Sequence, residues 1–194
     1  MSFNVFSGGS VTPIDPPVIS GKVSSITFTD LPETSGLITL TSYDLQGGIN
    51  TFTDGSSMTK NTLKYNLDIA PGRYTFELKQ LHTPFTVIVR LDCILEEGNC
   101  VISYNDLIRI TITDLPQSGS MRLFNAVTRD IICNRVTVMD SARSYSYGIS
   151  TSILQPGSHK LSLELVNSPF TKIVEFNCTL SVGLNSFSYN SVKP

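Results

Sequence analysis

Apolar and polar residues alternate with a period of two along most of the chain. The alternation is clearest in four segments: 63–69, 74–79, 85–93 and 108–113. In the last of these, three isoleucines are separated by Arg109 and Thr111. A period of two predicts β-strands with one buried face, and no segment combines a helical period with helix caps. The sequence therefore predicts an all-β protein.

The pattern occurs twice. Residues 26–32 read ITFTDLP, and residues 110–116 read ITITDLP. Other matched pairs follow at nearly the same spacing: Pro71 and Gly72 with Pro156 and Gly157, Thr83 to Thr86 with Ser168 to Thr171, Cys93 with Cys178, and Ser103 to Asn105 with Ser188 to Asn190. Such spacing indicates a tandem duplication of one unit the size of a small domain.

Turn-forming residues divide each unit into six or seven short strands. A proline fixes φ and the glycine after it tolerates positive φ, as at Pro71–Gly72, while Glu97–Gly98 marks a later turn. We predict two tandem, similar antiparallel β-sandwich domains of immunoglobulin-like or jelly-roll-like type. The predicted repeats span residues 23–105 and 106–194. Almost no linker separates them, so we expect abutting, restrained units.

Residues 1–22 contain several glycines and prolines and show no steady periodicity. This composition predicts an extended N-terminal arm, with a disordered tail as the alternative. Phe3, Val5 and Phe6 near its tip predict a strap onto a neighbouring subunit. The arm lacks a basic start followed by an apolar run, so we expect no classical secretion. The expected location is a virion, or the cytoplasm of the producing cell before assembly.

The chain is poor in charge. Charged residues make up 15% of it, and the net charge is −2. Soluble domains usually contain about 25% charged residues, so this surface is weakly solvated and suits packing against neighbours. We expect a homo-oligomer or other structural proteins of a larger assembly as partners. No basic patch indicates nucleic acid, and no apolar run is long enough for membrane insertion.

The four cysteines are Cys93, Cys100, Cys133 and Cys178. Cys93 and Cys178 match between the repeats and lie on the apolar phase, whereas Cys100 matches Asn185. The repeats therefore lack a shared disulfide, and we predict small buried thiols in a reducing compartment. A Cys93–Cys100 disulfide across a hairpin is the alternative, and it needs diagonal geometry.

No motif predicts catalysis, a cofactor or a metal. The two histidines, His82 and His159, have no histidine counterparts, and no CxxC, GxSxG or phosphate-binding loop is present. Asp30 and Asp114 follow the first strand of each repeat, with Asp106 nearby. We interpret the two repeated acids as Asx turns, in which the carboxylate accepts backbone N–H bonds. A calcium site between the domains is the alternative, although it needs more oxygen ligands.

The repeats diverge most in residues 44–61 and 126–147. The second segment carries Arg143, Tyr145 and Tyr147, residue types that suit a protein or sugar surface. These three residues are candidates for a recognition surface. The pattern favours solvent loops or ordinary strand aromatics, and the absence of tryptophan weakens the sugar hypothesis.

These features favour a non-catalytic structural or assembly protein. The most concrete version is a virion component, such as an accessory or minor capsid, vertex or tail protein. A pair of carbohydrate-binding or adhesion modules is the alternative, although no motif supports a glycan partner. An enzyme is the third hypothesis, and it requires a cleft with convergent polar groups between the units.

Overall fold

The computed structural model describes residues 21–32, 38–44, 49–52, 61–80, 86–138, 141–166 and 171–193. Within these ranges the chain forms fourteen strands, a 3₁₀ turn (Tyr104–Asp106) and one helical turn, α1 (Tyr189–Val192). The all-β prediction is confirmed. The boundary predicted between residues 105 and 106 falls inside the 3₁₀ turn.

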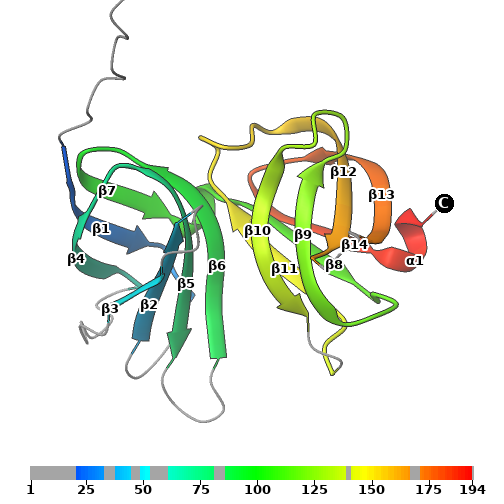
Figure 1. The fold of residues 1–194 in the computed structure, drawn as a ribbon, viewed down its shortest axis with the longest axis horizontal. Helices are drawn as coiled ribbons and strands as arrows, with labels where there is room; N and C mark the ends of the chain where they lie inside the picture. The colour runs from blue at the N-terminus through cyan, green and yellow to red at the C-terminus, as the bar shows by residue number, and fades with distance from the viewer. Residues whose placement is uncertain are drawn as a thin grey trace, which may run out of the picture.

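Each repeat supplies seven of these strands. The first repeat contains β1 (Val23–Thr29), β2 (Ile38–Asp44), β3 (Ile49–Phe52), β4 (Leu63–Ile69), β5 (Gly72–Gln80), β6 (Thr86–Leu95) and β7 (Gly98–Ser103). The second contains β8 (Ile108–Thr113), β9 (Gly119–Asn125), β10 (Ile131–Val138), β11 (Tyr145–Ile149), β12 (Gly157–Leu165), β13 (Thr171–Leu180) and β14 (Gly183–Ser188). Figure 1 shows the two groups side by side.

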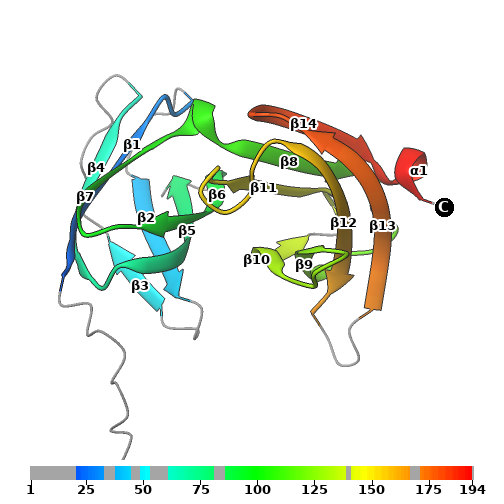
Figure 2. The same cartoon turned by 90° about the horizontal axis from the view of Figure 1, so that it is seen from above.

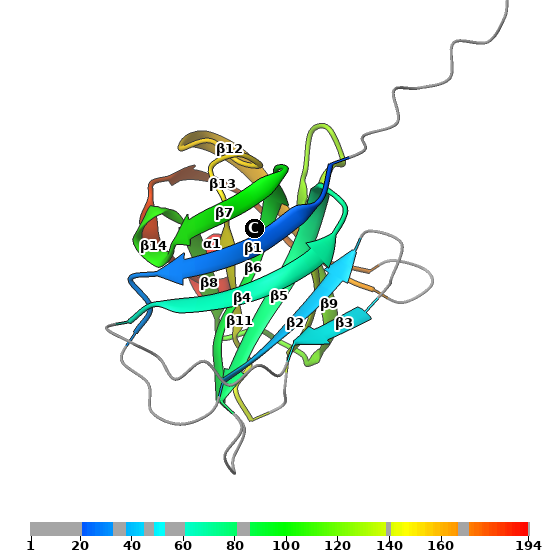
Figure 3. The same cartoon turned by 90° about the vertical axis from the view of Figure 1, so that its left-hand side faces the viewer.

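The strand order is the same in both repeats. In the first, β4, β1 and β7 form one layer, and β3, β2, β5 and β6 form the other, which lies behind it in Figure 3. In the second, β11, β8 and β14 correspond to the first layer, and β10, β9, β12 and β13 to the other. Constant-type immunoglobulin domains place their first, second, fourth and fifth strands in one sheet. The sandwich architecture is therefore shared with that class, but the strand order differs.

The two repeats share a sheet. The edge strand β6 of the first repeat pairs in parallel with β11 of the second, where Leu91 lies opposite Gly148 and Asp92 opposite Ile149. This pairing joins strands of both repeats into one seven-stranded sheet, in the order β14-β8-β11-β6-β5-β2-β3 (Figure 2). We call this contact the joint. The division into two separate domains stays a prediction.

At the joint, opposite faces of the shared sheet pack on the two apolar cores. Paired residues on neighbouring strands face the same side, and successive residues face opposite sides. Leu91 belongs to the core of the first repeat and Ile149 to the core of the second. Asp92 therefore lies on the face that covers the second core. A charged residue thus becomes buried because the sheet changes its core face at this point.

Gly148 permits the close approach of the strands at the joint. A Cβ atom there would lie 3.1 Å from Cδ1 of Leu107 and 3.4 Å from the carbonyl oxygen of Arg90. Leu107 comes just before β8, yet it is 2% exposed and packs in the first core. A glycine in a strand often marks such an approach.

We predict that Gly148→Asn lowers the free energy of unfolding by about 1–3 kcal/mol, because the added side chain overpacks the joint. The control is Asn66→Ala, at the matched position of the exposed edge strand β4, which should change stability by less than about 0.5 kcal/mol. Urea unfolding measures both. Equal midpoints for Gly148→Asn and the wild type would contradict the packing described here.

Candidate functional site

A buried carboxylate occupies the centre of the joint. Asp92 is 1% exposed, and its Oδ2 lies 2.8 Å from Nη2 of Arg73. Its Oδ1 accepts hydrogen bonds from Thr75 Oγ1 at 2.7 Å and from the Tyr147 hydroxyl at 2.6 Å. The first repeat supplies the carboxylate, the arginine and the threonine, whereas the second supplies the tyrosine. Directional contacts therefore fix how the repeats meet.

Backbone groups of the second repeat complete this cluster. Nη2 of Arg73 also donates to the carbonyl oxygen of Ile132 on β10 at 2.7 Å. The backbone N–H of Ser150 donates to the carbonyl oxygen of Asp92 at 2.9 Å. Burying an ion pair costs desolvation, which only good geometry and further hydrogen bonds offset. The carboxylate of Asp92 meets both conditions, whereas the buried Nε of Arg73 has no hydrogen-bond partner among the described residues.

Tyr147 acts as a hydrogen-bond donor in this cluster. Burial, together with the nearby charge of Asp92, holds the pKa of its hydroxyl well above the usual range. The phenol therefore keeps its proton over the whole physiological range and points it at the carboxylate.

The structure corrects the predicted role of two tyrosines. Tyr145 and Tyr147 are 0% and 2% exposed and stack in the second core, with ring centroids 6.1 Å apart. They pair with Ile112 and Ile110 of β8, whose side chains face the same core. They are strand aromatics and offer no recognition surface in this chain. The alternation of larger and smaller residues across 145–149 already indicated that Tyr145 and Tyr147 share one face of a strand.

Arg143 stabilises a turn. Its φ is +45°, its Nη1 donates to the carbonyl oxygen of Pro116 at 2.6 Å, and its own carbonyl accepts from the N–H of Leu115 at 3.0 Å. These contacts tie it to the loop after β8. The other predicted contact residues, Phe3, Val5 and Phe6, lie outside the described residues, as does most of segment 44–61.

Asp30 and Asp114 have the same structural role. Both have a φ of +57°, and their Oδ2 atoms accept hydrogen bonds from Ser103 Oγ at 2.8 Å and Ser188 Oγ at 2.6 Å. The partners are hydroxyl groups of the last strand of each repeat, where the Asx-turn prediction expected backbone N–H groups. The described residues contain no cluster of three or more acidic, histidine or cysteine side chains that could hold a metal.

The cysteines are free thiols, as the sequence favoured. Glu97 and Gly98 do connect β6 to β7, but these strands lie in different sheets, so the hairpin pairing considered for a Cys93–Cys100 disulfide does not form. Burial raises the pKa of Cys93 and Cys133 well above the usual range, and it raises the pKa of Cys178 to about 11. Such thiols are poor nucleophiles at neutral pH.

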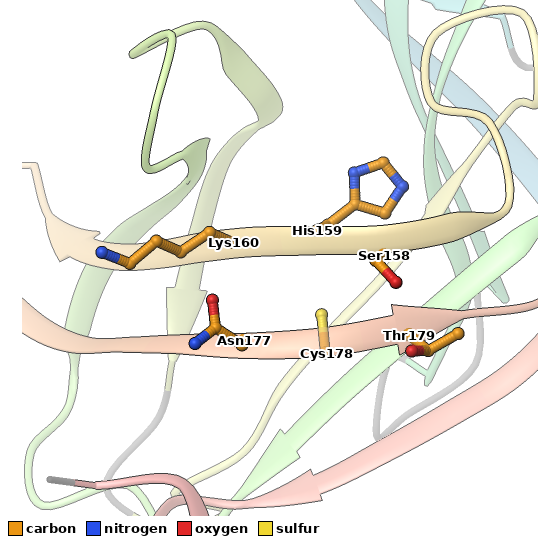
Figure 4. A pocket seen from close by; sticks show the side chains of 6 residues that line it. All are labelled: Ser158, His159, Lys160, Asn177, Cys178 and Thr179. Atoms are coloured by element: carbon orange, nitrogen blue, oxygen red, sulfur yellow. The ribbon is translucent and has the colours of Figure 1, made fainter.

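A groove of about 600 Å³ follows β12 and β13 in the second repeat. Figure 4 shows its lining: Ser158, His159 and Lys160 from β12, and Asn177, Cys178 and Thr179 from β13. In it, Lys160 Nζ lies 2.6 Å from Oε1 of Glu175, and His159 Nε2 lies 2.8 Å from the carbonyl oxygen of Gln155. Sequence reasoning missed this groove, because a lone unrepeated His159 gives no signal for one.

The groove is the counterpart of the joint. Strand pairing matches Asn177 and Lys160 in the second repeat to Asp92 and Thr75 in the first. In the first repeat, β11 covers this surface. In the second, β13 pairs with β12 alone among the described strands, and α1 also contacts it. Among the described residues, no helix has the length and apolar character needed to cross a membrane.

No protein-family model matches this chain, and no curated protein sequence matches it. Among solved structures, the Bacillus anthracis TIE protein is 12% identical, with a TM-score of 0.27 over 89% of this chain and 34% of that one. A DUF3823 family protein from Bacteroides ovatus is 11% identical, with a TM-score of 0.28 over 85% of this chain and 98% of that one. A tetra-tandem repeat of a large adhesion protein is 13% identical, with a TM-score of 0.24 over 82% of this chain and 50% of that one. The chain thus spans about a third of the first and half of the third. These similarities concern the fold alone.

We predict that Asp92→Asn lowers the free energy of unfolding by about 3 kcal/mol, because it leaves the guanidinium of Arg73 without its counter-charge. The control, Asn177→Asp, makes the reverse exchange of amide and carboxylate at the exposed counterpart position and should cost less than about 0.5 kcal/mol. Chemical unfolding of both variants measures the difference. Equal losses would show that burial at the joint is not the cause.

Thiol alkylation tests the buried cysteines. At about pH 8 we expect Cys178 in the folded chain to react about a hundredfold more slowly than in the unfolded chain, because little thiolate forms below a pKa of about 11. Cys93 and Cys133 should react more slowly still. Iodoacetamide labelling followed by peptide mass spectrometry gives each rate. Fast labelling of Cys133 in the folded chain would contradict its burial.

Proposed function

We propose that the chain is a non-catalytic structural module that holds two β-sandwich units in one fixed orientation within a larger assembly. The observation that carries this proposal is the joint, where a shared sheet and the buried Asp92 cluster connect the repeats. Such a connection suits a building block or spacer more than two units on a flexible tether. The low charge of 15% supports packing against neighbours.

The most concrete form of this role is a virion component, such as an accessory or minor capsid, vertex or tail protein. Duplication, low charge and free cysteines motivate it. Homo-oligomers or other structural proteins are the proposed partners, and residues 1–22 the proposed strap. The raised pKa values of Cys93, Cys133 and Cys178 support a role without thiol catalysis.

A carbohydrate-binding or adhesion module pair is the second candidate. The groove along β12 and β13 favours it, because hydroxyl, amide and ammonium groups of Ser158, Asn177 and Lys160 line an open polar surface. The six lining residues include no tyrosine, phenylalanine or tryptophan on which a sugar ring could stack. Retention on a glycan array that Lys160→Ala abolishes would favour this candidate.

Light scattering behind a sizing column tests the assembly role. We expect the full chain, from low to high micromolar concentration, to form a defined oligomer that dissociates when residues 1–22 are removed. The deletion ends just before β1, which begins at Val23, so it removes no described residue of the apolar core. A monomer in both forms, with no binding to structural proteins of its source, would contradict the proposal.

A further inference from the structure

The second repeat contains an unused copy of the surface that forms the joint. β6 and β13 occupy the same place in the two repeats, and each pairs on one side with the preceding strand, β5 or β12. On its other side β6 pairs with β11, whereas β13, which lines the groove, pairs with no second strand in the described part of the chain, where α1 lies against it. An unpaired edge offers backbone N–H and C=O groups to an added strand.

The residues of the groove along β12 and β13 are compatible with burial under an added strand. At the joint, burial requires the ion pair between Arg73 and Asp92. Register places uncharged Ser158 and Asn177 at the matched positions of the groove. Its lysine, Lys160, pairs with a carboxylate of the same surface. An added strand would therefore bury no unpaired acid, and the desolvation cost would fall on the Lys160–Glu175 pair.

The chain's own edge strand β4 is the counterpart of β11, but two residues prevent it from binding in the same way. Pairing with the first strand of each repeat matches Asn66 to Gly148. Lys22 and Leu107 are also at matched positions. The N–H of Gly98 donates to the carbonyl oxygen of Lys22, and the N–H of Gly183 donates to that of Leu107, each at 2.9 Å. Leu107 is buried, whereas the Lys22 side chain is 68% exposed.

Docking β4 on β13 with the geometry of the joint would bury the ion pair of Lys22 with Asp68 and force the Asn66 side chain into a space that fits glycine. Both changes are costly. Charged and bulky residues at an exposed edge commonly block unwanted strand pairing. Lys22 and Asn66 therefore prevent copies of this chain from joining head to tail through β4 and β13.

We propose that the β13 edge accepts a strand from a partner β-sandwich protein. The partner strand runs parallel to β13 and carries a glycine at the position of Gly148. An apolar residue precedes its sandwich, at the position of Leu107. The internal joint defines this chemistry, and a second copy of the chain does not satisfy it. This inference deepens the proposed assembly role by naming the surface and the kind of strand that binds there.

The test gives the chain both missing features. We expect the double variant Lys22→Leu, Asn66→Gly to associate head to tail at least about tenfold more strongly than the wild type, as measured by light scattering over the same concentrations. Both positions are at the surface, and circular dichroism checks that the fold is kept. Adding Asn177→Lys should abolish the gain, because it places a charge in the new joint. Adding Ile49→Lys, at an exposed position on β3, should leave the gain intact.

A folded double variant that keeps the wild-type mass at every concentration would overturn the proposal. Association that Asn177→Lys leaves unchanged would also overturn it, because a different surface would then be responsible. The comparison is between variants and wild type. A monomeric wild type therefore counts against the proposed assembly role without deciding this test.

Discussion

The parallel pairing of β6 with β11 is the contact on which the rest of the structure depends. It joins the two sandwiches through one sheet and turns opposite faces of that sheet toward the two cores. That change of face buries Asp92, and the donors from Arg73, Thr75 and Tyr147 compensate the buried charge. Gly148 lets the strands approach. Without this pairing, Asp92 would not be buried between the repeats, and no strand would approach Gly148 closely.

The duplication was followed by specialisation at the surfaces where the repeats meet. Features that maintain each sandwich are repeated, such as the left-handed aspartates Asp30 and Asp114 and their serine partners. Features that belong to the joint are present once: Leu107 and Gly148 on one side, Arg73 and Asp92 on the other. At the outer edges, the counterparts of Leu107 and Gly148 are polar, and the counterparts of Arg73 and Asp92 are uncharged. The chain thus resembles other repeat proteins, whose outer faces differ from their internal interfaces.

Sequence reasoning predicted the strands well, because an apolar phase such as that of residues 63–69 depends only on local alternation. It missed the joint, because the pairing of β6 with β11 is long-range and adds no local pattern. A comparison of matched positions would have given a signal, since Asp92 against Asn177 and Gly148 against Asn66 are the substitutions that an interface imposes. The burial of Tyr145 and Tyr147 follows from their phase in the strand, which their residue type alone does not indicate.

We infer that the joint fixes the relative orientation of the two sandwiches. Pulsed electron paramagnetic resonance tests it directly, with spin labels at the exposed positions Lys64 and Lys160 in a chain whose native cysteines are replaced by serine or alanine. A fixed joint gives one narrow distance distribution, which broadens when Asp92→Asn is added. A broad or two-peaked distribution in the otherwise unaltered chain would contradict it.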